Sequence, residues 1–358
     1  MRIALVHDYL VQYGGAERVV EALHGVWPEA PVFTSLYDAE TMPESFARMD
    51  VRTSYLQRSR GLRRNSKLGL PLYPSAFRSL DLSGFDVVVS SSSGWAHAVR
   101  TDPGAFHLVY CHTPARWLYR TGSYVRAERV PAAPLLPALR RWDRRAAARP
   151  TQYLANSETT RARIFAHYGR HATVVHPPVQ TDRFAPGETG DYFVCASRLT
   201  AYKRIDLAID ACAELGAPLL VAGVGPARAA LERRAKGQVE FLGRVSDEEL
   251  AELFSGCRAL IVPAEEDFCI AAVEAMAAGT PVVGFARGGL LETVQLDRTG
   301  VLFGSQTVDS LVGALVRLES LELDPAAIRA HALRFDELRF QARMRLVVEG
   351  EAATAAVA

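Results

Sequence analysis

Long hydrophobic runs are missing from this chain of 358 residues, although 49% of its residues are hydrophobic. The longest apolar stretches, such as Ala217–Val224, end well short of the roughly 18 residues that span a bilayer. The start, MRIALVHDYL, reaches His7 and Asp8 too soon for the apolar core of a secretory leader. We therefore expect a cytoplasmic protein that does not cross the membrane.

Cysteine is also scarce, and its spacing indicates neither a disulfide framework nor a zinc site. The five cysteines are odd in number, widely separated and free of any Cys-x-x-Cys pair. We interpret them as reduced thiols, most of them in the core. With 23% charged residues, 26 Gly and 19 Pro, the composition also excludes a disordered, collagen-like or coiled-coil chain.

The net charge of +1 conceals two halves of opposite charge. Residues 1–178 contain 23 Lys and Arg against 14 Asp and Glu, whereas residues 179–358 contain 18 against 26. A DNA-binding protein would more often be basic throughout, so we expect no nucleic-acid partner. One basic half suits an anionic small ligand or an anionic membrane surface. Solvated, arginine-rich helix faces explain any single basic cluster equally well.

Short apolar runs rich in β-branched residues alternate with amphipathic segments of helical length, which predicts an α/β protein with parallel sheets. In the first half we expect strands at Arg2–His7, Asp86–Ser90, His107–Cys111, Tyr153–Ala155 and Thr173–His176. In the second half we expect them at Tyr192–Ala196, Leu219–Ala222, Val239–Leu242, Ala259–Val262 and Pro281–Phe285. This pattern predicts two Rossmann-like, doubly wound domains whose strand ends face a cleft.

Two prolines after His176 mark the expected domain boundary, because proline cannot continue a central strand. A length of about 150 residues per domain also fits two domains. We expect the first domain at 1–178 and the second at 179–334. The segment 335–358 would form a helix at about Glu337–Val348 that packs back across the first domain, followed by a frayed tail from residue 351.

Two adjacent glycines, Gly14 and Gly15, follow the first expected strand and open a helix at Glu17–Val26. Adjacent glycines let backbone N–H groups approach an anion, and the helix N-terminus adds a partial positive charge. The spacing is not Gly-x-Gly-x-x-Gly, so it is weak support for a dinucleotide site. Taken alone, the motif is better interpreted as a tight strand-to-helix turn.

Arg198 and Lys203 follow the first expected strand of the second half. A forked guanidinium and a point-charge ammonium at the carboxyl end of a strand could clamp a diphosphate. Surface salt bridges explain the two residues equally well.

An acidic loop follows the strand Ala259–Val262, and we expect a helix to begin near Ile270 and to stop at Gly279. Glu266 lies in the loop and Glu274 about one turn inside the helix, where both could accept hydrogen bonds from sugar and ribose hydroxyls. The N–H groups from Phe268 through Cys269 to Ile270 would face a phosphate. The alternative is an acidic first turn that complements the helix dipole.

Together these motifs resemble the retaining glycosyltransferases of family 4, which have the two-Rossmann GT-B fold. Glu266 and Glu274 match the family's pair of glutamates separated by seven residues, and the continuation EAMAAGTPVV matches as well. Arg198 and Lys203 stand where the family has its diphosphate-binding Arg and Lys. The glycine loop and the segment CHTP at 111–114 also fit, and the matches run from residue 4 to about residue 295. The family usually has Gly where this chain has Cys269.

The resemblance implies a role for each matching residue. Glu266 would bind hydroxyls of the donor sugar, Glu274 would bind the nucleotide ribose, and His112 would lie beside the donor sugar. Arg198 and Lys203 would neutralise the diphosphate leaving group. The base would meet the backbone around Gly243, Arg244 and Val245.

His112 also follows the expected strand His107–Cys111 at its carboxyl end, so it would point into the cleft. A core or helix-capping histidine is the alternative. The acidic loops contain no Asp-x-Asp motif, so we expect sugar transfer with neither an obligatory metal ion nor a cofactor. When a nucleoside diphosphate departs, cationic side chains that meet its charge supply the largest expected catalytic effect.

The substrates are suggested by the segments GGAERV, CHTPARWLY and AEEDF, which resemble the family branch that contains bacterial O-antigen and related mannosyltransferases using GDP-mannose. We expect the hydroxyl acceptor, a lipid-linked glycan or a small metabolite, in the first domain. The stretch Ser90–His97 could receive a polar acceptor, and an ordinary helix-capping run explains it equally well.

Two other functions remain open at this point. A sugar-nucleotide epimerase or a phosphorylase could use the same architecture, although a phosphorylase needs a pyridoxal-phosphate lysine and only Lys67, Lys203 and Lys236 are present. A non-catalytic sugar-nucleotide-binding subunit is the third interpretation, suggested by Cys269 in place of glycine.

A basic cluster at Arg58–Lys67 leads directly into the apolar segment Leu68–Phe77. Such an arrangement could rest on the anionic inner face of a membrane, with the apolar side chains entering the interface. Packing of these apolar residues on the first sheet is the alternative.

Overall fold

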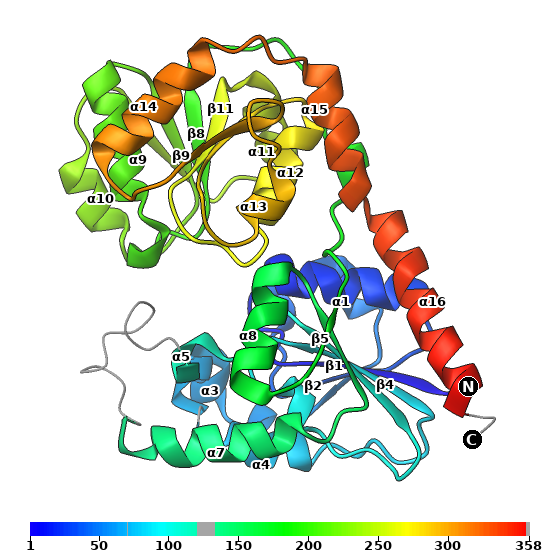
Figure 1. Cartoon of the computed structure of the whole chain (residues 1–358). Coiled ribbons are helices and arrows are strands. Elements are labelled where there is room, and N and C mark those ends of the chain that lie inside the picture. Colours follow the sequence, from blue (N-terminus) through cyan, green and yellow to red (C-terminus); the bar gives the residue numbers. More distant parts are fainter. Residues whose placement is uncertain (70, 120–132, 356–358) are drawn as a thin grey trace. The chain divides into compact units, whose positions relative to one another are not determined.

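The computed structural model describes residues 1–69, 71–119 and 133–355, which form two units (Figure 1). Unit 1 consists of Met1–Pro178 together with Leu338–Ala358, and unit 2 consists of Val179–Glu337. Each unit is built on one sheet whose paired strands run parallel. The prediction of two Rossmann-like parallel sheets is therefore confirmed.

The sheet of unit 1 has the strand order β3-β2-β1-β4-β5-β6-β7. This order reverses between β1 and β4, and ligands of such sheets bind outside the carboxyl ends of the strands at that switch point. The register places His7, the last residue of β1, opposite Ser91 of β4. The strands are β1 (Ile3–His7), β2 (Val32–Thr34), β3 (Val51–Thr53), β4 (Val87–Ser92), β5 (Phe106–Cys111), β6 (Gln152–Ala155) and β7 (Thr173–Val174).

Both faces of this sheet are buried, because alternate residues of each strand enter different clusters. Leu5 and Val89 belong to one cluster, whereas Val6 and Val88 belong to another. The covering helices are α1 (Gly15–Val26), α2 (Glu44–Ala47), α3 (Arg60–Arg64), α4 (Tyr73–Arg78), α5 (Arg116–Tyr119), α7 (Leu136–Ala147) and α8 (Glu158–Tyr168).

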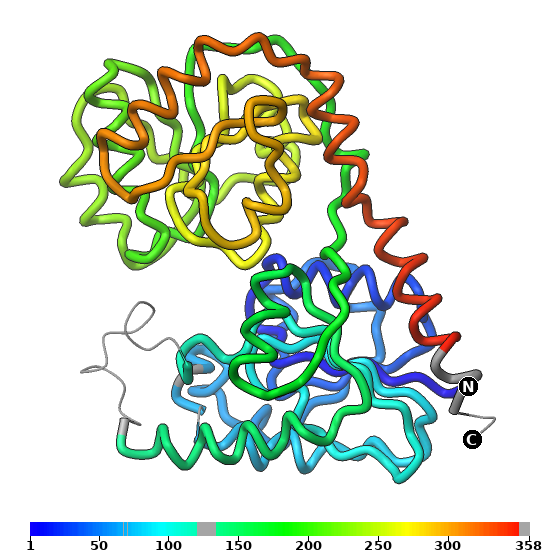
Figure 2. The backbone as a smooth tube through the Cα atoms, viewed as in Figure 1, coloured from blue at the N-terminus to red at the C-terminus, as the bar shows by residue number. Residues whose placement is uncertain are grey.

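The C-terminal helix α16 (Glu337–Ala355) completes unit 1. Phe340, Met344 and Val348 are buried in the same cluster as Leu5. The helix lies beside α1 (Figure 2), where Gln341 Nε2 donates to Ala22 O at 3.3 Å. The expected end near Val348 is too early, because the alanine-rich continuation has high helix propensity and the helix extends to Ala355. Residues 356–358 lie outside the described residues.

The sheet of unit 2 has the order β10-β9-β8-β11-β12-β13 and reverses between β8 and β11. Its strands are β8 (Phe193–Ala196), β9 (Leu219–Ala222), β10 (Val239–Gly243), β11 (Ala259–Val262), β12 (Val282–Phe285) and β13 (Gly300–Phe303). Its helices are α9 (Ile205–Leu215), α10 (Arg228–Arg234), α11 (Asp247–Gly256), α12 (Ile270–Ala277), α13 (Leu290–Thr293), α14 (Val308–Glu319) and α15 (Pro325–Ala332).

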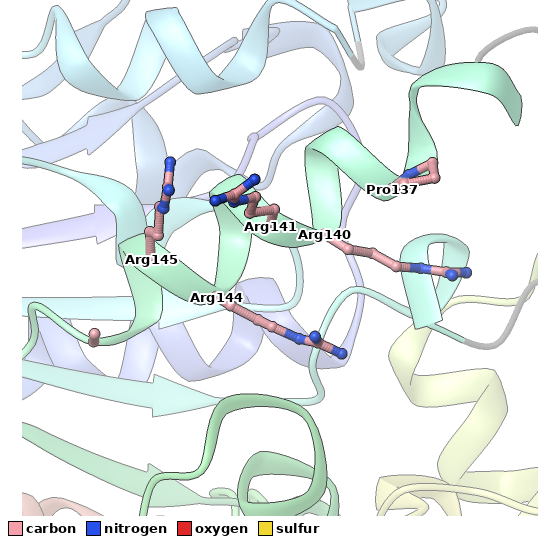
Figure 3. A pocket seen from close by; sticks show the side chains of 6 residues that line it. Pro137, Arg140, Arg141, Arg144 and Arg145 are labelled. Atoms are coloured by element: carbon pink, nitrogen blue, oxygen red, sulfur yellow. The ribbon is translucent and has the colours of Figure 1, made fainter.

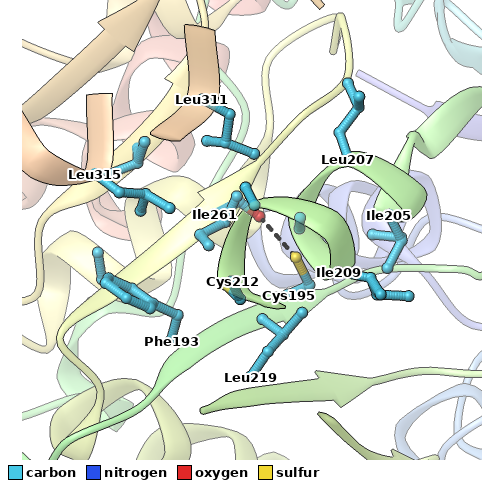
Figure 4. Packing of buried hydrophobic residues seen from close by; sticks show 14 of the residues in the cluster. Phe193, Cys195, Ile205, Leu207, Ile209, Cys212, Leu219, Ile261, Leu311 and Leu315 are labelled. Carbon is cyan, nitrogen blue, oxygen red and sulfur yellow. Dashed lines mark hydrogen bonds between the residues drawn. The ribbon is translucent and has the colours of Figure 1, made fainter. Parts of the chain in front are cut away.

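One core of unit 2 packs helices α9 and α14 against β8 and β11 (Figure 4). Within it, the buried thiol of Cys195 donates a hydrogen bond to the carbonyl of Ile261 at 3.3 Å. Burial raises the pKa of Cys195 well above its ordinary value. This cysteine is therefore a protonated core residue, as the spacing of the cysteines predicts.

Three strands were not predicted from the sequence: β2, β3 and β13. Each is short and lies at or next to an edge of its sheet. Within the described ranges, no helix combines the length and the apolar composition needed to cross a bilayer.

Candidate functional site

The candidate site of unit 2 lies where the strand order reverses. The loop after β8 leads through Ser197–Thr200 into the short helix η8 (Ala201–Lys203), and the loop after β11 leads through Pro263–Cys269 into α12. Because β8 and β11 are parallel neighbours, these two loops leave the same edge of the sheet. The fold thus brings together segments that are more than sixty residues apart in the sequence.

Lys203 and Glu266 form an ion pair across these two loops. Their side chains are only 15% and 12% exposed. Burial opposes the charged form of Lys203, but the charge and hydrogen bond of Glu266, with a contribution from Tyr202, raise its pKa above the ordinary value. Lys203 is therefore a cation held in place by a carboxylate, in a partly dehydrated position where charge interactions are strong.

Cys269 stands immediately before α12 in the left-handed conformation, with φ of 73° and ψ of 76°. Glycine adopts this conformation without strain, which gives a physical reason for a glycine at this position. Burial raises the pKa of the Cys269 thiol to about 12. The charges of Glu266 and Glu274 contribute to this raised pKa and Lys203 opposes them, so these three charged groups lie near the thiol. A protonated thiol is a poor nucleophile, which leaves Cys269 with a structural role.

Glu274 is 4% exposed on α12, which begins at Ile270 as predicted and ends at Ala277, before Gly279. The start of the helix is anchored by Phe268, whose buried ring packs edge-on against Phe335 with ring centroids 5.6 Å apart. This packing fixes the backbone that carries Glu266 on one side and Glu274 on the other.

Two glycines that the sequence analysis did not single out hold the loop of Glu266. A Cβ on Gly288 would lie 2.0 Å from the carbonyl oxygen of Glu266, and one on Gly289 would lie 2.3 Å from Cα of Phe268. Gly289 N donates to Glu266 O at 2.9 Å. Any side chain at these two positions would push the acidic loop away, and the only signal in the sequence is the pair of adjacent glycines itself.

Arg198 is exposed in the loop after β8. That loop is tied to its neighbours, because Leu199 N donates to Val224 O at 2.9 Å and Gly223 N donates to Gly243 O at 2.6 Å. Gly243 ends β10 with φ of 78°, followed by exposed Arg244 and half-buried Val245. Backbone hydrogen bonds thus join the loops after β8, β9 and β10 along one edge of the sheet.

In unit 1, Gly14 precedes α1 as its N-terminal cap and Gly15 is the first helical residue. A Cβ on Gly14 would lie 3.3 Å from Oε2 of Glu17, which is 3% exposed in the first turn of the helix. The glycine therefore leaves room for a buried carboxylate. His112 follows β5 directly and is 9% exposed.

Consecutive serines of β4 each bond a histidine. Ser90 Oγ lies 2.8 Å from His107 Nε2, Ser91 Oγ lies 2.8 Å from His112 Nε2, and Ser92 Oγ lies 3.4 Å from His97 Nδ1. Ser90 is 0% exposed, and its hydroxyl bonds His107 and the carbonyl of Ala96 inside the unit.

Asp8, also missed by the sequence analysis, organises the segment that follows these serines. Its carboxylate accepts the backbone N–H groups of Ser93, Trp95 and Ala96 at 2.6, 2.7 and 2.8 Å. The only sequence signal is an acidic residue directly after β1, at the switch point of unit 1.

Across the residues with described positions, no group of three or more His, Cys, Asp or Glu side chains is arranged to hold a metal ion. The candidate site of unit 2 combines the cation of Lys203 with the carboxylates of Glu266 and Glu274.

Comparison with solved structures places the fold among the GT-B glycosyltransferases. The structure of HepE from Anabaena in complex with UDP-glucose superposes with a TM-score of 0.74 over 98% of this chain and 100% of its own, at 16% sequence identity.

Two family models cover consecutive parts of the sequence. The model described as Glycosyltransferase Family 4 matches residues 13–183, and the model described as Glycosyl transferases group 1 matches residues 179–334. Together the two models match residues 13–334, so the chain belongs to the glycosyltransferases that these models describe.

Curated relatives match about half of the chain. A D-inositol 3-phosphate glycosyltransferase from Mycolicibacterium paratuberculosis is 34% identical over 184 residues, which are 44% of this chain and 42% of the relative. A GDP-mannose-dependent alpha-(1-6)-phosphatidylinositol monomannoside mannosyltransferase from Mycobacterium tuberculosis is 31% identical over 195 residues, 45% of this chain and 51% of the relative. The chain thus spans about half the length of these two relatives.

Proposed function

We propose that this protein transfers a hexose from a nucleoside-diphosphate sugar to a hydroxyl acceptor, with retention of the anomeric configuration and without a metal ion or other cofactor. The observation that carries the proposal is the cluster of Lys203, Glu266 and Glu274 at the switch point of unit 2. It presents a held cation and two carboxylates at the sheet edge where α/β proteins bind nucleotides.

The chemistry assigned to this cluster follows from its charges. The bond between the anomeric carbon and the diphosphate oxygen breaks, and the electron pair leaves with the nucleoside diphosphate. Lys203 and Arg198 would stabilise the developing negative charge. The acceptor oxygen then bonds to the anomeric carbon, and its proton leaves with the diphosphate.

The carboxylates would bind neutral hydroxyls. We assign the sugar hydroxyls to Glu266 and the ribose hydroxyls to Glu274, because carboxylate oxygens accept strong hydrogen bonds. The N–H groups from Phe268 to Ile270 would meet a phosphate, and the backbone from Gly243 to Val245 would meet the base. In unit 1, we assign His112 to the donor sugar, the loop of Gly14 and Gly15 to an anionic part of a substrate, and the acceptor to this unit.

GDP-mannose is the donor we favour. The relative from Mycobacterium tuberculosis is named as GDP-mannose-dependent, whereas the HepE structure contains UDP-glucose. Both nucleotide sugars are therefore compared as donors. A thermal-shift screen should show that GDP-mannose raises the melting temperature more than UDP-glucose does, because ligands stabilise the state that binds them. A larger shift with UDP-glucose would overturn the choice of base, and no shift with any nucleotide sugar would overturn the proposed function.

Substitutions of the two carboxylates should have different effects. Glu274→Ala should weaken nucleotide binding, whereas Glu266→Gln should mainly lower kcat, because Glu266 meets the sugar that changes charge and shape during transfer. Glu252→Gln, on the exposed face of α11, is the matched control and should change neither quantity. Equal nucleotide affinity in Glu274→Ala and the control would remove Glu274 from the site.

We also propose that the acceptor is lipid-linked and that unit 1 approaches it from an anionic membrane. Arg58, Arg60 and Arg64 are exposed, and Leu68 and Leu72 are 64% and 44% exposed. In contrast, Tyr73 and Phe77 of the same apolar segment are buried, so only part of that segment is available to a membrane. Leu70 lies outside the described residues.

A second basic surface lies on the same layer of unit 1. Leu62 of α3 and Leu139 and Trp142 of α7 pack against one core cluster, so both helices cover the same face of the sheet. Helix α7 carries a hollow lined by arginines (Figure 3), which are Arg140, Arg141, Arg144 and Arg145. Each basic residue near an anionic surface contributes about 1 kcal/mol to binding.

Co-sedimentation with anionic liposomes tests this surface. Wild-type protein should bind at low salt and be released at high salt. The triple variant Arg60→Ser, Arg63→Ser and Arg64→Ser should bind more weakly. The matched control replaces three exposed arginines of α16, Arg339, Arg343 and Arg345, and should bind as wild type does. No wild-type binding at low salt, or equal loss in both triple variants, would reject the proposed surface.

A further inference from the structure

A chain of buried polar groups connects the start of α1 with His112. Glu17 Oε1 lies 3.4 Å from His7 Nε2, and His7 Nδ1 lies 3.1 Å from both the carbonyl oxygen and Oγ of Ser91. Ser91 Oγ in turn lies 2.8 Å from His112 Nε2. Glu17, His7 and Ser91 are 3%, 1% and 1% exposed, so bulk water does not share these bonds.

The partners of His7 determine where its protons are. A backbone carbonyl oxygen only accepts, so Nδ1 must carry a proton to bond Ser91 O. A carboxylate also only accepts, so Nε2 carries a proton toward Glu17. With Glu17 ionised, His7 is an imidazolium. Burial opposes this charge, but the hydrogen bond and charge of Glu17, with Asp8 and the Ser91 carbonyl adding to them, raise the pKa of His7.

The proton on His7 Nδ1 determines the role of the Ser91 hydroxyl in the next hydrogen bond. Because His7 Nδ1 donates toward Ser91, the serine oxygen acts there as an acceptor. A hydroxyl has one hydrogen, and we infer that this hydrogen points to His112 Nε2, which lies 2.8 Å away. A ring nitrogen that accepts a hydrogen bond carries no proton, so a neutral His112 has its proton on Nδ1.

We propose that Glu17, His7 and Ser91 are positioning residues that hold the His112 imidazole in one orientation and in the tautomer protonated on Nδ1. The carboxylate of Glu17 also lies next to Gly14, so this series of hydrogen bonds links the glycine turn to His112. The consequence for turnover rests on the proposed function, in which His112 contacts the donor sugar. The tautomer itself does not depend on that function.

Nitrogen–proton correlation spectra of the full chain, with isotope-labelled histidine, test the proton positions directly. The signals are assigned by their loss in His7→Gln and in His112→Gln. Near neutral pH, both nitrogens of His7 should carry protons and His112 should carry one on Nδ1 only. A bare nitrogen on His7, or a proton on Nε2 of a neutral His112, would overturn the proposal whatever the activity is.

Turnover with GDP-mannose, followed as GDP release, tests the positioning role against a purely structural one. Ser91→Ala should lower kcat about tenfold, because a misoriented group loses its productive geometry, and should leave KM nearly unchanged. Ser90→Ala is the matched control: it loses a buried serine–histidine bond of the same 2.8 Å length on the same strand. It should destabilise the protein similarly and leave kcat within about twofold.

The outcomes separate the two proposals. Equal kcat in the two serine variants would overturn the positioning role. If wild-type protein releases no nucleoside diphosphate from any nucleotide sugar, the proposed function fails, while the histidine spectra still decide the tautomer. If Ser91→Ala does not fold, Glu17→Gln replaces it. Removing the carboxylate charge should take one proton from His7 and lower kcat. Unchanged protonation of His7 would overturn the proposed series of hydrogen bonds.

Discussion

Replacing Asp8 should destabilise unit 1, because its carboxylate accepts three backbone N–H groups from the segment after β4. Asp8, Trp95 and Ala96 are 4%, 2% and 0% exposed, so water cannot take over as the acceptor for Trp95 and Ala96. Ser93 is only half-buried, and water can reach its N–H group.

The magnitude follows from these contacts. A buried donor left without a partner costs about 1–3 kcal/mol, so two of them in Asp8→Ala cost about 4 kcal/mol. The variant also avoids burying a charge, which offsets part of this loss and leaves a net destabilisation of about 3 kcal/mol. Asp8→Asn keeps one oxygen for Trp95 and Ala96 but turns an NH₂ group toward the Ser93 N–H. We expect it to cost about 2 kcal/mol.

Urea unfolding followed by tryptophan fluorescence measures this unit selectively. All four tryptophans lie in unit 1, at positions 27, 95, 117 and 142. Trp95 reports on the segment itself, with ring centroids 5.0 Å from Trp117 and 5.6 Å from Trp142. Asp81→Ala is the control, because this exposed carboxylate also accepts a backbone N–H, from Ser83, and its loss should leave the midpoint nearly unchanged. Equal midpoints for Asp8→Ala and Asp81→Ala would refute the reasoning.

Three further predictions concern single groups. Burial lowers the pKa of His107 to about 3, with the charges of His97 and Arg149 adding to the effect. The stabilisation from neutral His107 is complete above the unfolded pKa of about 6.5, and the free energy of unfolding falls by about 2 kcal/mol near pH 5. Urea unfolding of His107→Gln should therefore lack this loss of stability in acid. Calorimetry should find Cys269→Gly more stable than Cys269→Ala by about 1 kcal/mol, because only glycine relieves the positive φ; equal stabilities would show that the conformation is unstrained. Lys203→Met should lower kcat about a hundredfold or more, whereas Lys236→Met, at an exposed lysine, should not, and matching rates would exclude Lys203 from leaving-group stabilisation.

The sheets were predictable where strands are central and apolar. The strands at Leu219–Ala222 and Ala259–Val262 have the bounds expected from the sequence, because parallel strands buried on both faces appear as short, continuous apolar runs. Val32–Thr34 and Val51–Thr53 have three residues each, too few to show a period. The pairing of β2 with β1 and of β3 with β2 follows from the fold and has no local signal.

The residues of the candidate site in unit 2 were predictable from motif spacing, but their contacts were not. The ion pair of Lys203 and Glu266 depends on β8 and β11 being neighbours, which the order of the strands in the sequence does not state. His7 and Ser91 are 84 residues apart and meet through the register of β1 and β4. The need for Gly288 arises from a backbone approach that exists only in the folded chain.

The central claim is that the switch point of unit 2 binds a nucleoside diphosphate through Glu274 and its neighbours. Calorimetric titration of GDP, UDP and ADP into wild-type protein, Glu274→Ala and Glu252→Gln tests it most directly. We predict saturable binding of one of these nucleotides to the wild type and to Glu252→Gln, and binding at least about tenfold weaker to Glu274→Ala, a loss of about 1.4 kcal/mol. No binding of any of the three nucleotides to the wild type, or equal affinity in the two glutamate variants, would contradict it.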